Sequence, residues 1–592
     1  MMKTQLMQRW QQVSQYLADW SDSLLAAENT LQQKDKVYNW QAWLLPTLLG
    51  LLFALQNPLL YGMAPAYDAS LFATMGKMWA DGAVLYRDMI DIKGPVIFLL
   101  DAIGYAIGGF QGIWLLETVL LIWGLNALYR TLALWGIAPL SRLAGMLAWL
   151  FLYAYRYYYG NMTEDYTFCL GLIAQYHFVR MLLAERFRWQ DAVIPAVTFG
   201  LIAMLRMNNA AMWCGYYLAL FVYWAWQRRW QDALKLTISG VAGLLVIALP
   251  LLAYFVWHGV LSDFWFYSFG IFFGSSYGSG HSLMVGFLGL ARTGLLLLLP
   301  AFIAVVWQQQ RSADNTRPWG ILLATQLTGI VMGIVANSVS GHTYEHYEIL
   351  FFTSAILMLP VVIQAARSGG LTGQIGCRHI QRAGILTLLL VVGYLLAQHI
   401  IFTWSRFESP MPKLTYELLV SLTASVITTA ILVGIWLVTR SHRLYLPAMS
   451  LLVVLSVLMV LLPLERGLTK GRPFDEVSEQ MVEHINANTS YDDLIWVDGI
   501  IPQYYVWTER RPASAYLFFD NVTPPYDVRA RMMDDLKRNK PKFIIVKLTR
   551  MEKVLGGKDR DSTPSFIAYY NYINEAYQPV SADLPRLYRL KE

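Results

Sequence analysis

The sequence predicts a mainly α-helical, polytopic membrane protein that ends in a smaller α/β domain. Of its 592 residues, 56% are hydrophobic and only 15% are charged, whereas an ordinary soluble protein carries about 25% charged residues. The charge is also uneven, because residues 465–592 carry 19 basic and 19 acidic side chains while residues 1–464 share the other 48 charges. These observations exclude a single water-soluble domain and favour a membrane body followed by a soluble one.

The net charge of +6 belongs to the membrane body, since the charges of residues 465–592 sum to zero. Basic residues that flank membrane helices set the orientation of those helices. We therefore assign the basic excess to membrane topology and expect no nucleic-acid partner.

Residues 1–40 precede the first apolar run and are expected to form a cytoplasmic amphipathic helical segment. Apolar side chains recur there at alternating spacings of four and three, at Leu6, Trp10, Val13, Leu17, Trp20 and Leu24. This spacing places one apolar stripe along a helix. The stripe fits the lipid interface or a protein partner, and packing against the protein's own loops is the alternative.

The membrane body is predicted to occupy residues 41–464. A bilayer core about 30 Å thick needs about 20 apolar residues per helix. Thirteen segments meet or approach this length, at 42–60, 113–134, 139–155, 167–184, 191–205, 210–226, 235–256, 284–307, 318–337, 349–366, 383–404, 416–438 and 444–462. The apolar run at 95–110 is shorter and is broken by three glycines, so we expect a re-entrant or interfacial helix there.

Threading thirteen spans through the membrane brings most loop arginines to one side, which the positive-inside rule identifies as the cytoplasm. These arginines are Arg186, Arg188, Arg228, Arg229, Arg311, Arg317, Arg367, Arg378, Arg382, Arg440 and Arg443. The loops at 61–94, 156–166, 257–283, 338–348 and 405–415 then lie outside. An odd number of spans also carries residues 465–592 outside, while the N-terminus stays in the cytoplasm.

Residues 465–592 are predicted to form an extracytoplasmic α/β domain. Helical periodicity and β-branched or aromatic runs alternate there. We expect helices near 475–488, 526–539 and 564–576, and strands near 494–497, 504–507, 513–519, 542–547 and 586–590. Gly556 and Gly557 indicate an ordinary turn, and no Gly-rich phosphate loop is present in this part of the sequence.

The first predicted outer loop, 61–94, is the most polar segment of the membrane body, and we expect it to carry the chemistry. Its candidate catalytic carboxylates are Asp68, Asp88 and Asp91, and Lys93 follows them. A carboxylate at the membrane surface can take the proton from an acceptor hydroxyl or amine as the acceptor attacks an electrophilic carbon. A neighbouring Lys or Arg can neutralise a phosphate leaving group. A solvated loop without chemistry is the alternative.

The second predicted outer loop adds two carboxylates beside a cation. Arg156 precedes Asn161, Thr163 and the pair Glu164–Asp165. Asn161 or Thr163 is expected to cap the following helix, whose dipole favours acidic residues in its first turn. This structural interpretation is compatible with a sugar site at the same loop.

A third polar segment, 340–348, contains His342, Tyr344 and His346. The two histidines are four residues apart, so on a helix they share one face, as metal-binding histidines can. Hydrogen bonding or phosphate contacts are favoured instead, because no third metal ligand can be assigned. No metal-ligating residue is therefore predicted, and dependence on a divalent cation such as Mg²⁺ or Mn²⁺ stays open.

Arg206 stands at the outer end of the short candidate span 191–205. An ionisable side chain at membrane depth is costly and indicates a functional site. An anionic lipid phosphate is its expected partner.

The polar segments contain a series of motifs that resembles the GT-C superfamily of integral-membrane glycosyltransferases. The motifs are Asp68 shortly after the first span, Leu85-Tyr86-Arg87-Asp88, Asp91-x-Lys93-Gly94-Pro95, Asn161-x-Thr163-Glu164-Asp165 and the His346-Tyr347 pair. The closing α/β domain is similar to that family too. The nearest branch is the bacterial one that includes aminoarabinose transferases and relatives of the protein O-mannosyltransferases.

The resemblance implies a polyprenyl-phosphate-linked sugar as donor. It implies that Asp68 acts as the base or positions the acceptor, and that Lys93 contacts the donor phosphate. Glu164 and Asp165 form a second acidic position by the same analogy.

This chain departs from the family's pattern in two places. Gly94 separates Lys93 from the following proline, and Asp68 stands alone where some relatives have an adjacent acidic pair. The division of roles among Asp68, Asp88 and Asp91 therefore stays open.

The predicted function is an inverting, polyprenyl-phosphate-sugar-dependent glycosyltransferase of a bacterial cytoplasmic membrane, acting on a cell-envelope polysaccharide, lipid or protein. Asp68 is expected to be the base. The expected substrate-binding residues are Lys93, Arg156 and Arg206 for the phosphate, and His342, Tyr344 and His346 around the cavity. A transporter or flippase of lipid-linked sugars is one alternative, although it would place ionisable residues within repeated spans. A non-catalytic cell-envelope scaffold is the other.

Overall fold

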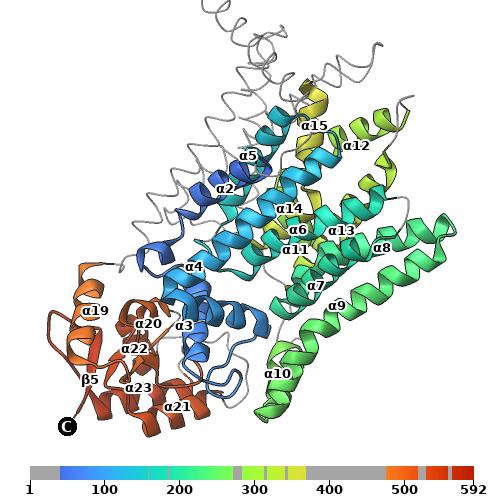
Figure 1. Ribbon diagram of the computed structural model, residues 1–592. Coiled ribbons are helices and arrows are strands. Elements are labelled where there is room, and N and C mark those ends of the chain that lie inside the picture. Colours follow the sequence, from blue (N-terminus) through green and yellow to red (C-terminus); the bar gives the residue numbers. More distant parts are fainter. Residues whose placement is uncertain are drawn as a thin grey trace, which may run out of the picture.

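The computed structural model describes residues 41–157, 159–184, 187–270, 283–311, 317–340, 344–367, 475–499, 501–517, 528–557 and 563–591. The predicted N-terminal helix, the last three candidate spans and His342 lie outside these residues. Figure 1 shows a bundle of long helices with a smaller α/β unit against one end of it.

Apolar helices account for nearly all of the bundle. In chain order its elements are α2 Gln41–Ala54, η1 Pro58–Tyr61, α3 Tyr67–Ala80, α4 Pro95–Leu134, α5 Pro139–Arg156, α6 Thr163–Leu183, α7 Trp189–Leu205, η2 Met207–Ala210, α8 Ala211–Trp226, α9 Trp230–Trp257, α10 Leu261–Ser268, α11 Leu283–Arg292, α12 Leu295–Arg311, α13 Trp319–Ser340, η4 Glu345–Glu348, α14 Ile349–Ala355 and α15 Met358–Arg367. The chain is thus mainly helical, as predicted.

Helix α9 shows how the bundle meets lipid. Its 28 residues give a length of about 42 Å. Apolar side chains along one face are exposed, among them Leu234, Val241 and Leu249, and a soluble protein rarely leaves such a continuous face uncovered. Trp230 and Trp257, at the two ends, are 61% and 86% exposed, which matches the aromatic belts of membrane helices.

Three described helices are long and apolar enough to cross a membrane: Pro95–Leu134, Trp230–Trp257 and Trp319–Val339. A fourth candidate is the pair Glu345–Ala355 and Met358–Ala365, which is bent by 57°. The multi-pass character is therefore confirmed, while the count of thirteen stays a prediction.

Two predicted spans are broken. The run 284–307 forms α11 and α12, which are separated at Gly294, a residue with φ +75°. The run 349–366 bends before Pro360. In a regular helix, a proline ring clashes with the backbone carbonyl of the residue four positions earlier. That carbonyl, on Ile356, instead accepts a hydrogen bond from the Trp149 indole at 2.7 Å.

The apolar run at 95–110 forms the first part of α4, and Gly108 and Gly109 depart from helical geometry there. Gly109 has φ +63°, a conformation that glycine adopts without strain. The segment folds back on the rest of α4, since a Cβ on Gly104 would lie 2.7 Å from the Ile113 Cα atom. The break confirms that this run is separate from the candidate span at 113–134.

The predicted outer loop 61–94 is not a simple loop. Residues Tyr67–Ala80 form α3, whose side chains from Ala69 to Met78 are buried. Most of this segment therefore packs inside the protein, although the side chains of Asp68, Arg87 and Asp88 are 45%, 54% and 40% exposed. The alternative of a solvated loop without chemistry stays open.

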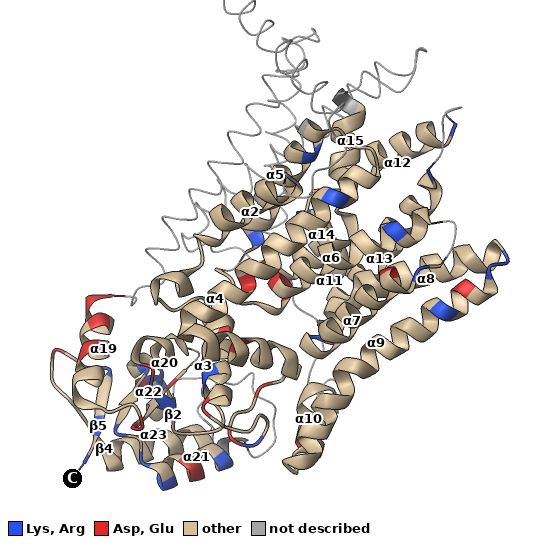
Figure 2. Ribbon diagram, in the orientation of Figure 1, with Lys and Arg blue, Asp and Glu red and all other residues tan. Residues whose placement is uncertain are grey.

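The C-terminal unit is α/β. It comprises α19 Glu476–Asn488, β1 Leu494–Val497, α20 Gln503–Thr508, β2 Arg511–Pro512, α21 Val528–Asn539, β3 Phe543–Ile545, α22 Leu548–Leu555, α23 Pro564–Ala576, β4 Tyr577–Pro579 and β5 Leu587–Leu590. The five strands have the order β2-β1-β3-β5-β4. β1 is parallel to β2 and β3, and β5 is antiparallel to β3 and β4. Figure 2 shows Lys, Arg, Asp and Glu gathered in this unit and sparse along the bundle.

Most predicted elements of this unit are confirmed, but two strands are not. Tyr504–Trp507 belong to helix α20, and only Arg511–Pro512 pair as β2, just before the expected strand at 513–519. Tyr504, Tyr505 and Val506 are buried on α20, and Val506 belongs to the same hydrophobic cluster as Ala73 of α3 and Phe110 of α4. Contact with the bundle thus accounts for the helix where aromatic residues favoured a strand.

Hydrogen bonds join the C-terminal unit to one end of the bundle. The backbone N–H of Ile90 donates to the Ala515 carbonyl at 2.8 Å. The hydroxyls of Tyr267 and Tyr516 are 2.9 Å apart, and Tyr491 donates to Asp81 at 3.0 Å. The unit therefore rests on α3, on the segment after it and on α10.

Candidate functional site

Lys93 lies at the centre of a group of charged side chains at the start of α4. Its Nζ atom is 3.9 Å from Asp68 Oδ2 and 3.9 Å from Asp91 Oδ1. Asp91 Oδ1 also accepts the backbone N–H of Lys93 at 2.8 Å. Asp91 thus fixes the lysine backbone as well as balancing its charge.

The ammonium of Lys93 stays charged in this setting. Burial disfavours its charged form, but the Asp91 and Asp68 carboxylates outweigh burial and raise the pKa of Lys93. Burial also raises the pKa of Asp91, against the opposing attraction of Lys93. The position therefore provides a permanent cation that is only 17% exposed.

Gly94 accounts for the approach of Lys93 to α7. Its N–H donates to the Leu205 carbonyl at 3.1 Å, and a Cβ at this position would lie 2.1 Å from the Met204 carbonyl oxygen. Only glycine fits such a backbone contact. The contact brings the residue before Gly94 next to the residue after Leu205, which is Arg206.

Arg206 follows the last helical residue of α7 and links two further elements. One guanidinium nitrogen donates to Glu164 Oε1 at 2.8 Å, and another donates to the Tyr347 hydroxyl at 2.8 Å. Glu164 is in the first turn of α6 and Tyr347 is in η4. The arginine thus ties α6, α7 and η4 together at one point.

These contacts define a polar cluster that consists of Asp68, Asp91, Lys93, Glu164, Arg206, His346 and Tyr347. Lys93 interacts electrostatically with Arg206 and Tyr347. His346 interacts electrostatically with Glu164, Asp68, Arg206 and Lys93. The exposed Tyr344 stacks on His346 with ring centroids 5.6 Å apart. Four segments that are distant in sequence therefore meet here.

The arrangement suits an anionic ligand whose other end reacts. Two cations, Lys93 and Arg206, lie close enough to repel each other electrostatically. A phosphate placed there can accept charge-assisted hydrogen bonds from both. Asp68 is the most accessible carboxylate among the ion-paired ones of the cluster, with 45% of its side chain exposed, so it can meet a second substrate.

Arg156 takes part in a buried ion-pair network. Its Nε donates to Glu348 Oε2 at 2.8 Å, and another of its nitrogens donates to the Arg292 carbonyl at 2.9 Å. Arg292 Nε lies 3.0 Å from the other oxygen of Glu348. Arg156 therefore anchors η4, which carries Tyr347, and its predicted contact with a phosphate stays a prediction.

Asp165 and Asp88 are placed in structural contacts. The fully buried Asp165 accepts hydrogen bonds from the Tyr153 hydroxyl at 2.8 Å and from the Met162 N–H at 3.2 Å. Asp88 closes a turn by accepting the Val84 N–H at 2.8 Å. Their predicted catalytic roles are not tested by these contacts, but neither residue has a described contact with Lys93 or Arg206.

The predicted capping of α6 by Asn161 or Thr163 is wrong. The residue before the helix is Met162, and Asp165 accepts its N–H. Thr163 donates instead to Glu164. Asn161 has φ +58°, a conformation that asparagine tolerates, and its amide is turned toward the bundle interior.

Sequence reasoning missed a buried polar network around Asn161. The Asn161 amide donates to Asp101 at 2.8 Å and to the Ala69 carbonyl at 3.2 Å, and its backbone N–H donates to Glu117 at 3.1 Å. Asn57 also donates to Glu117, at 2.9 Å. The network fixes the residue beside Asp68. The available signal was two acids, Asp101 and Glu117, inside apolar runs.

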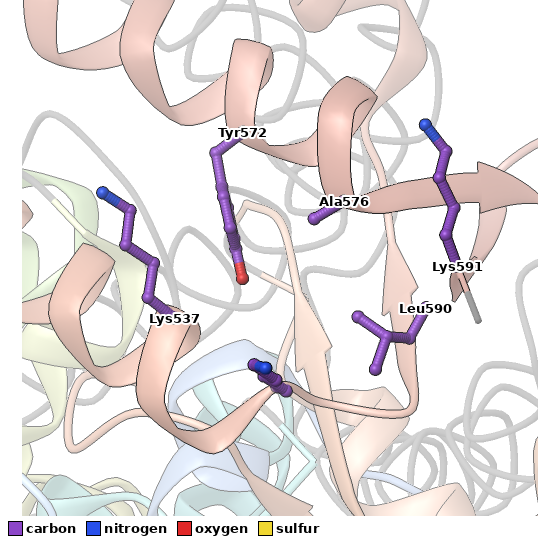
Figure 3. Close-up of a pocket in the computed structure, with 6 residues that line it drawn as sticks. Lys537, Tyr572, Ala576, Leu590 and Lys591 are labelled. Atoms are coloured by element: carbon purple, nitrogen blue, oxygen red, sulfur yellow. The ribbon is translucent and has the colours of Figure 1, made fainter.

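Other described features lie apart from the cluster. A pocket of about 420 Å³ on the C-terminal unit shares no residue with it (Figure 3) and is lined by Lys537, Lys540, Tyr572, Ala576, Leu590 and Lys591. Within the described ranges, no group of three or more His, Cys, Asp or Glu side chains is arranged to hold a metal ion.

Comparison with known proteins gives structural but not sequence matches. No family model and no curated protein matches the sequence. Among solved structures, the chain is similar to ArnT from Cupriavidus metallidurans bound to undecaprenyl phosphate, with TM-score 0.57, 15% identity and coverage of 92% of this chain and 97% of that one. The apo state of the same ArnT gives TM-score 0.56, 14% identity and coverage of 93% and 97%.

The similarity extends over nearly the full length of both chains, so it includes the bundle and the C-terminal unit together. The protein therefore has the polytopic membrane fold of ArnT, in agreement with the fold that the resemblance in sequence implied.

Proposed function

We propose that the protein is a membrane glycosyltransferase that transfers a sugar from a polyprenyl-phosphate-linked donor to an extracytoplasmic acceptor. The observation that carries the proposal is the convergence of Lys93 and Arg206 beside Asp68. The ArnT structure that shares this fold binds undecaprenyl phosphate, and a phosphate is the ligand that the two cations favour. The sugar and the class of acceptor, whether glycan, lipid or protein, are left open.

The cations prepare the site for the donor phosphate. Before the donor binds, Asp68 and Asp91 are the counter-ions of Lys93. A bound phosphate takes over this role at Lys93 and accepts a further hydrogen bond from Arg206. The carboxylate of Asp68 is thereby released to act on the second substrate.

The reaction then follows from these positions. Asp68 takes the proton of the acceptor hydroxyl or amine as that group forms a bond to the anomeric carbon. The bond from this carbon to the phosphate oxygen breaks, and the electron pair leaves with the polyprenyl phosphate. Lys93 and Arg206 stabilise the added negative charge. Attack opposite to the leaving group inverts the anomeric configuration.

The positive-inside pattern supports a site on the extracytoplasmic side of a bacterial inner membrane. The predicted outer segments, 61–94 and 338–348, both contribute residues to the cluster. A cell-envelope acceptor would reach Asp68 from that side.

The substitution Asp68→Asn tests the proposal. It keeps the side-chain shape but removes the base, so sugar transfer from a lipid-linked donor in proteoliposomes should fall by about 10²–10⁴-fold. Asp492→Asn is the matched control, because Asp492 is 85% exposed on the C-terminal unit, and its activity should equal that of the unsubstituted protein.

Full transfer by the Asp68→Asn protein, at normal expression, would remove the role assigned to Asp68. A transporter would instead move the intact lipid-linked sugar across the vesicle membrane without breaking the sugar–phosphate bond. Measuring sugar release and lipid translocation in the same vesicles separates these functions.

A further inference from the structure

Tyr86 has a backbone conformation that its side chain makes unfavourable. Its φ angle is +67°, in the left-handed region that a bulky residue adopts only when its surroundings impose it. The backbone N–H of Tyr86 donates to the Met89 carbonyl at 2.8 Å, which closes a tight turn in the segment between α3 and Lys93.

The Tyr86 side chain explains what holds this conformation. It is 1% exposed and packs against the rings of Phe255, Phe264 and Tyr267, with centroid distances of 5.4, 5.8 and 6.3 Å. These rings belong to α9 and α10. A strained tyrosine is thus inserted between the ends of two helices outside its own segment.

The hydroxyl of Tyr86 contacts the backbone of Lys93. It donates to the Lys93 carbonyl oxygen at 2.9 Å, and the Ser268 hydroxyl, 2.8 Å away, donates to it in turn. Since Asp91 accepts the Lys93 N–H and Leu205 accepts the next N–H, three partners hold the backbone around this lysine. Of these three partners, Tyr86 is the one that connects it to α10.

The position of α10 is in turn linked to the C-terminal unit. Tyr267, next to Ser268, shares a hydrogen bond with Tyr516, and the neighbouring Ala515 accepts the Ile90 N–H. Tyr86 therefore stands where the C-terminal unit, α10 and the Lys93 segment meet.

We propose that Tyr86 is a positioning residue for the donor phosphate, because its hydroxyl fixes the Lys93 peptide and so aims the Lys93 ammonium. The inference rests on the proposed function, in which Lys93 holds that phosphate. Tyr86 does not touch the donor itself. It acts through Lys93, so its contribution depends on the lysine side chain being present.

Direct binding of a polyprenyl phosphate to the full-length protein in detergent tests the proposal without requiring turnover. Tyr86→Phe keeps the aromatic ring and removes only the hydroxyl. We expect the dissociation constant to rise about fivefold to tenfold, the effect of one hydrogen bond. Ser268→Ala should also raise the dissociation constant. Tyr504→Phe is the control, because this buried tyrosine donates to Ser478 within the C-terminal unit, and its dissociation constant should not change.

A double-mutant cycle separates positioning from general stability. Lys93→Ala should weaken binding strongly, and adding Tyr86→Phe to it should cause no further loss, because the hydroxyl then has no ammonium to aim. The proposal would be overturned if the two substitutions weakened binding independently, so that the fold-changes in the dissociation constant multiplied in the double variant. It would also be overturned if the Tyr86→Phe protein bound polyprenyl phosphate as tightly as the wild type. If Tyr86→Phe does not fold, unchanged binding by Ser268→Ala overturns it.

The same measurements distinguish this inference from the proposed function. A protein that binds polyprenyl phosphate through Lys93 and Tyr86 but releases no sugar from a lipid-linked donor supports the inference and refutes the transferase. A wild-type protein that does not bind polyprenyl phosphate refutes both.

Discussion

The backbone N–H of Gly94 donates to the carbonyl of Leu205 at 3.1 Å, and this bond places Lys93 against Arg206. The glycine appears in the sequence only as an extra residue between Lys93 and Pro95. In the structure it is the point at which the start of α4 meets the end of α7. The proximity of Lys93 and Arg206 depends on the absence of a side chain at Gly94.

Gly94→Ala should weaken donor binding at least tenfold, because the new Cβ would lie 2.1 Å from the Met204 carbonyl oxygen and must push Lys93 away. Titration with a polyprenyl phosphate measures this loss. Gly240→Ala is the matched control, since its Cβ would only reach ordinary contact with the Tyr217 ring at 3.5 Å. Wild-type affinity in Gly94→Ala would mean that this contact does not set the position of Lys93.

Arg206→Lys should raise the KM for the lipid-linked donor about tenfold while the protein stays folded. A lysine keeps the charge but cannot donate to Glu164 and Tyr347 from a planar fork. Initial rates at varied donor concentration give the KM. Arg311→Lys, an exposed arginine that lies over Trp307 on α12, should leave it unchanged. An unaltered donor KM in Arg206→Lys would show that charge alone is sufficient at this position.

Glu348→Gln should destabilise the protein by about 3–5 kcal/mol, because it leaves the buried Arg156 without the carboxylate that pairs with it. Arg292 loses its ion pair with Glu348 as well. Thermal unfolding in detergent should show a lower Tm. A variant with normal Tm and weak donor binding would contradict this structural role and support the phosphate contact that the sequence predicted for Arg156.

Asp498 should make the C-terminal unit less stable as the pH rises. Burial raises the pKa of Asp498 from 3.8 to about 6, although the Lys547 N–H and the Tyr570 hydroxyl donate to it. Because the folded state holds this proton more tightly than the unfolded state, stability is greatest near pH 4 and falls until about pH 6. The full difference is about 3 kcal/mol.

Hydrogen exchange of β1 and β3 in the full-length protein, corrected for intrinsic rates, measures this dependence. In Asp498→Asn the protection of these strands should vary less between pH 4 and pH 7. An equal slope in both proteins would mean that another group controls the transition.

The polar residues of the cluster could be selected from the sequence, but their meeting could not. Lys93 and Arg206 are 113 positions apart, and their proximity depends on a backbone contact that leaves no periodic signal. Asp101 and Glu117 were overlooked because each lies in a run that reads as an apolar helix. Their structural role becomes clear only from the hydrogen bonds that Asn161 donates to both carboxylates.

The fold was predictable where local pattern and tertiary context agree. β3 is a buried run of one aromatic and two β-branched residues, and the pattern alone identifies it. Tyr504–Trp507 have the composition of a strand, yet packing on α3 makes them helical. The apolar run 284–307 has the length of one span, but Thr293 and Gly294 end α11 within it. Hydropathy cannot detect such a break.

The bond from Ile90 to Ala515 joins two segments that leave the ribosome about 425 residues apart. During synthesis, the nascent segment that carries Lys93 enters the membrane long before its partner exists. The hydrogen bond from Ile90 to Ala515, and the contact between Tyr267 and Tyr516, can form only after the C-terminal unit has folded. A chain whose synthesis stops early therefore lacks the contacts that hold this segment and α10 against the C-terminal unit, so the polar cluster is completed only by residues that are made hundreds of positions later.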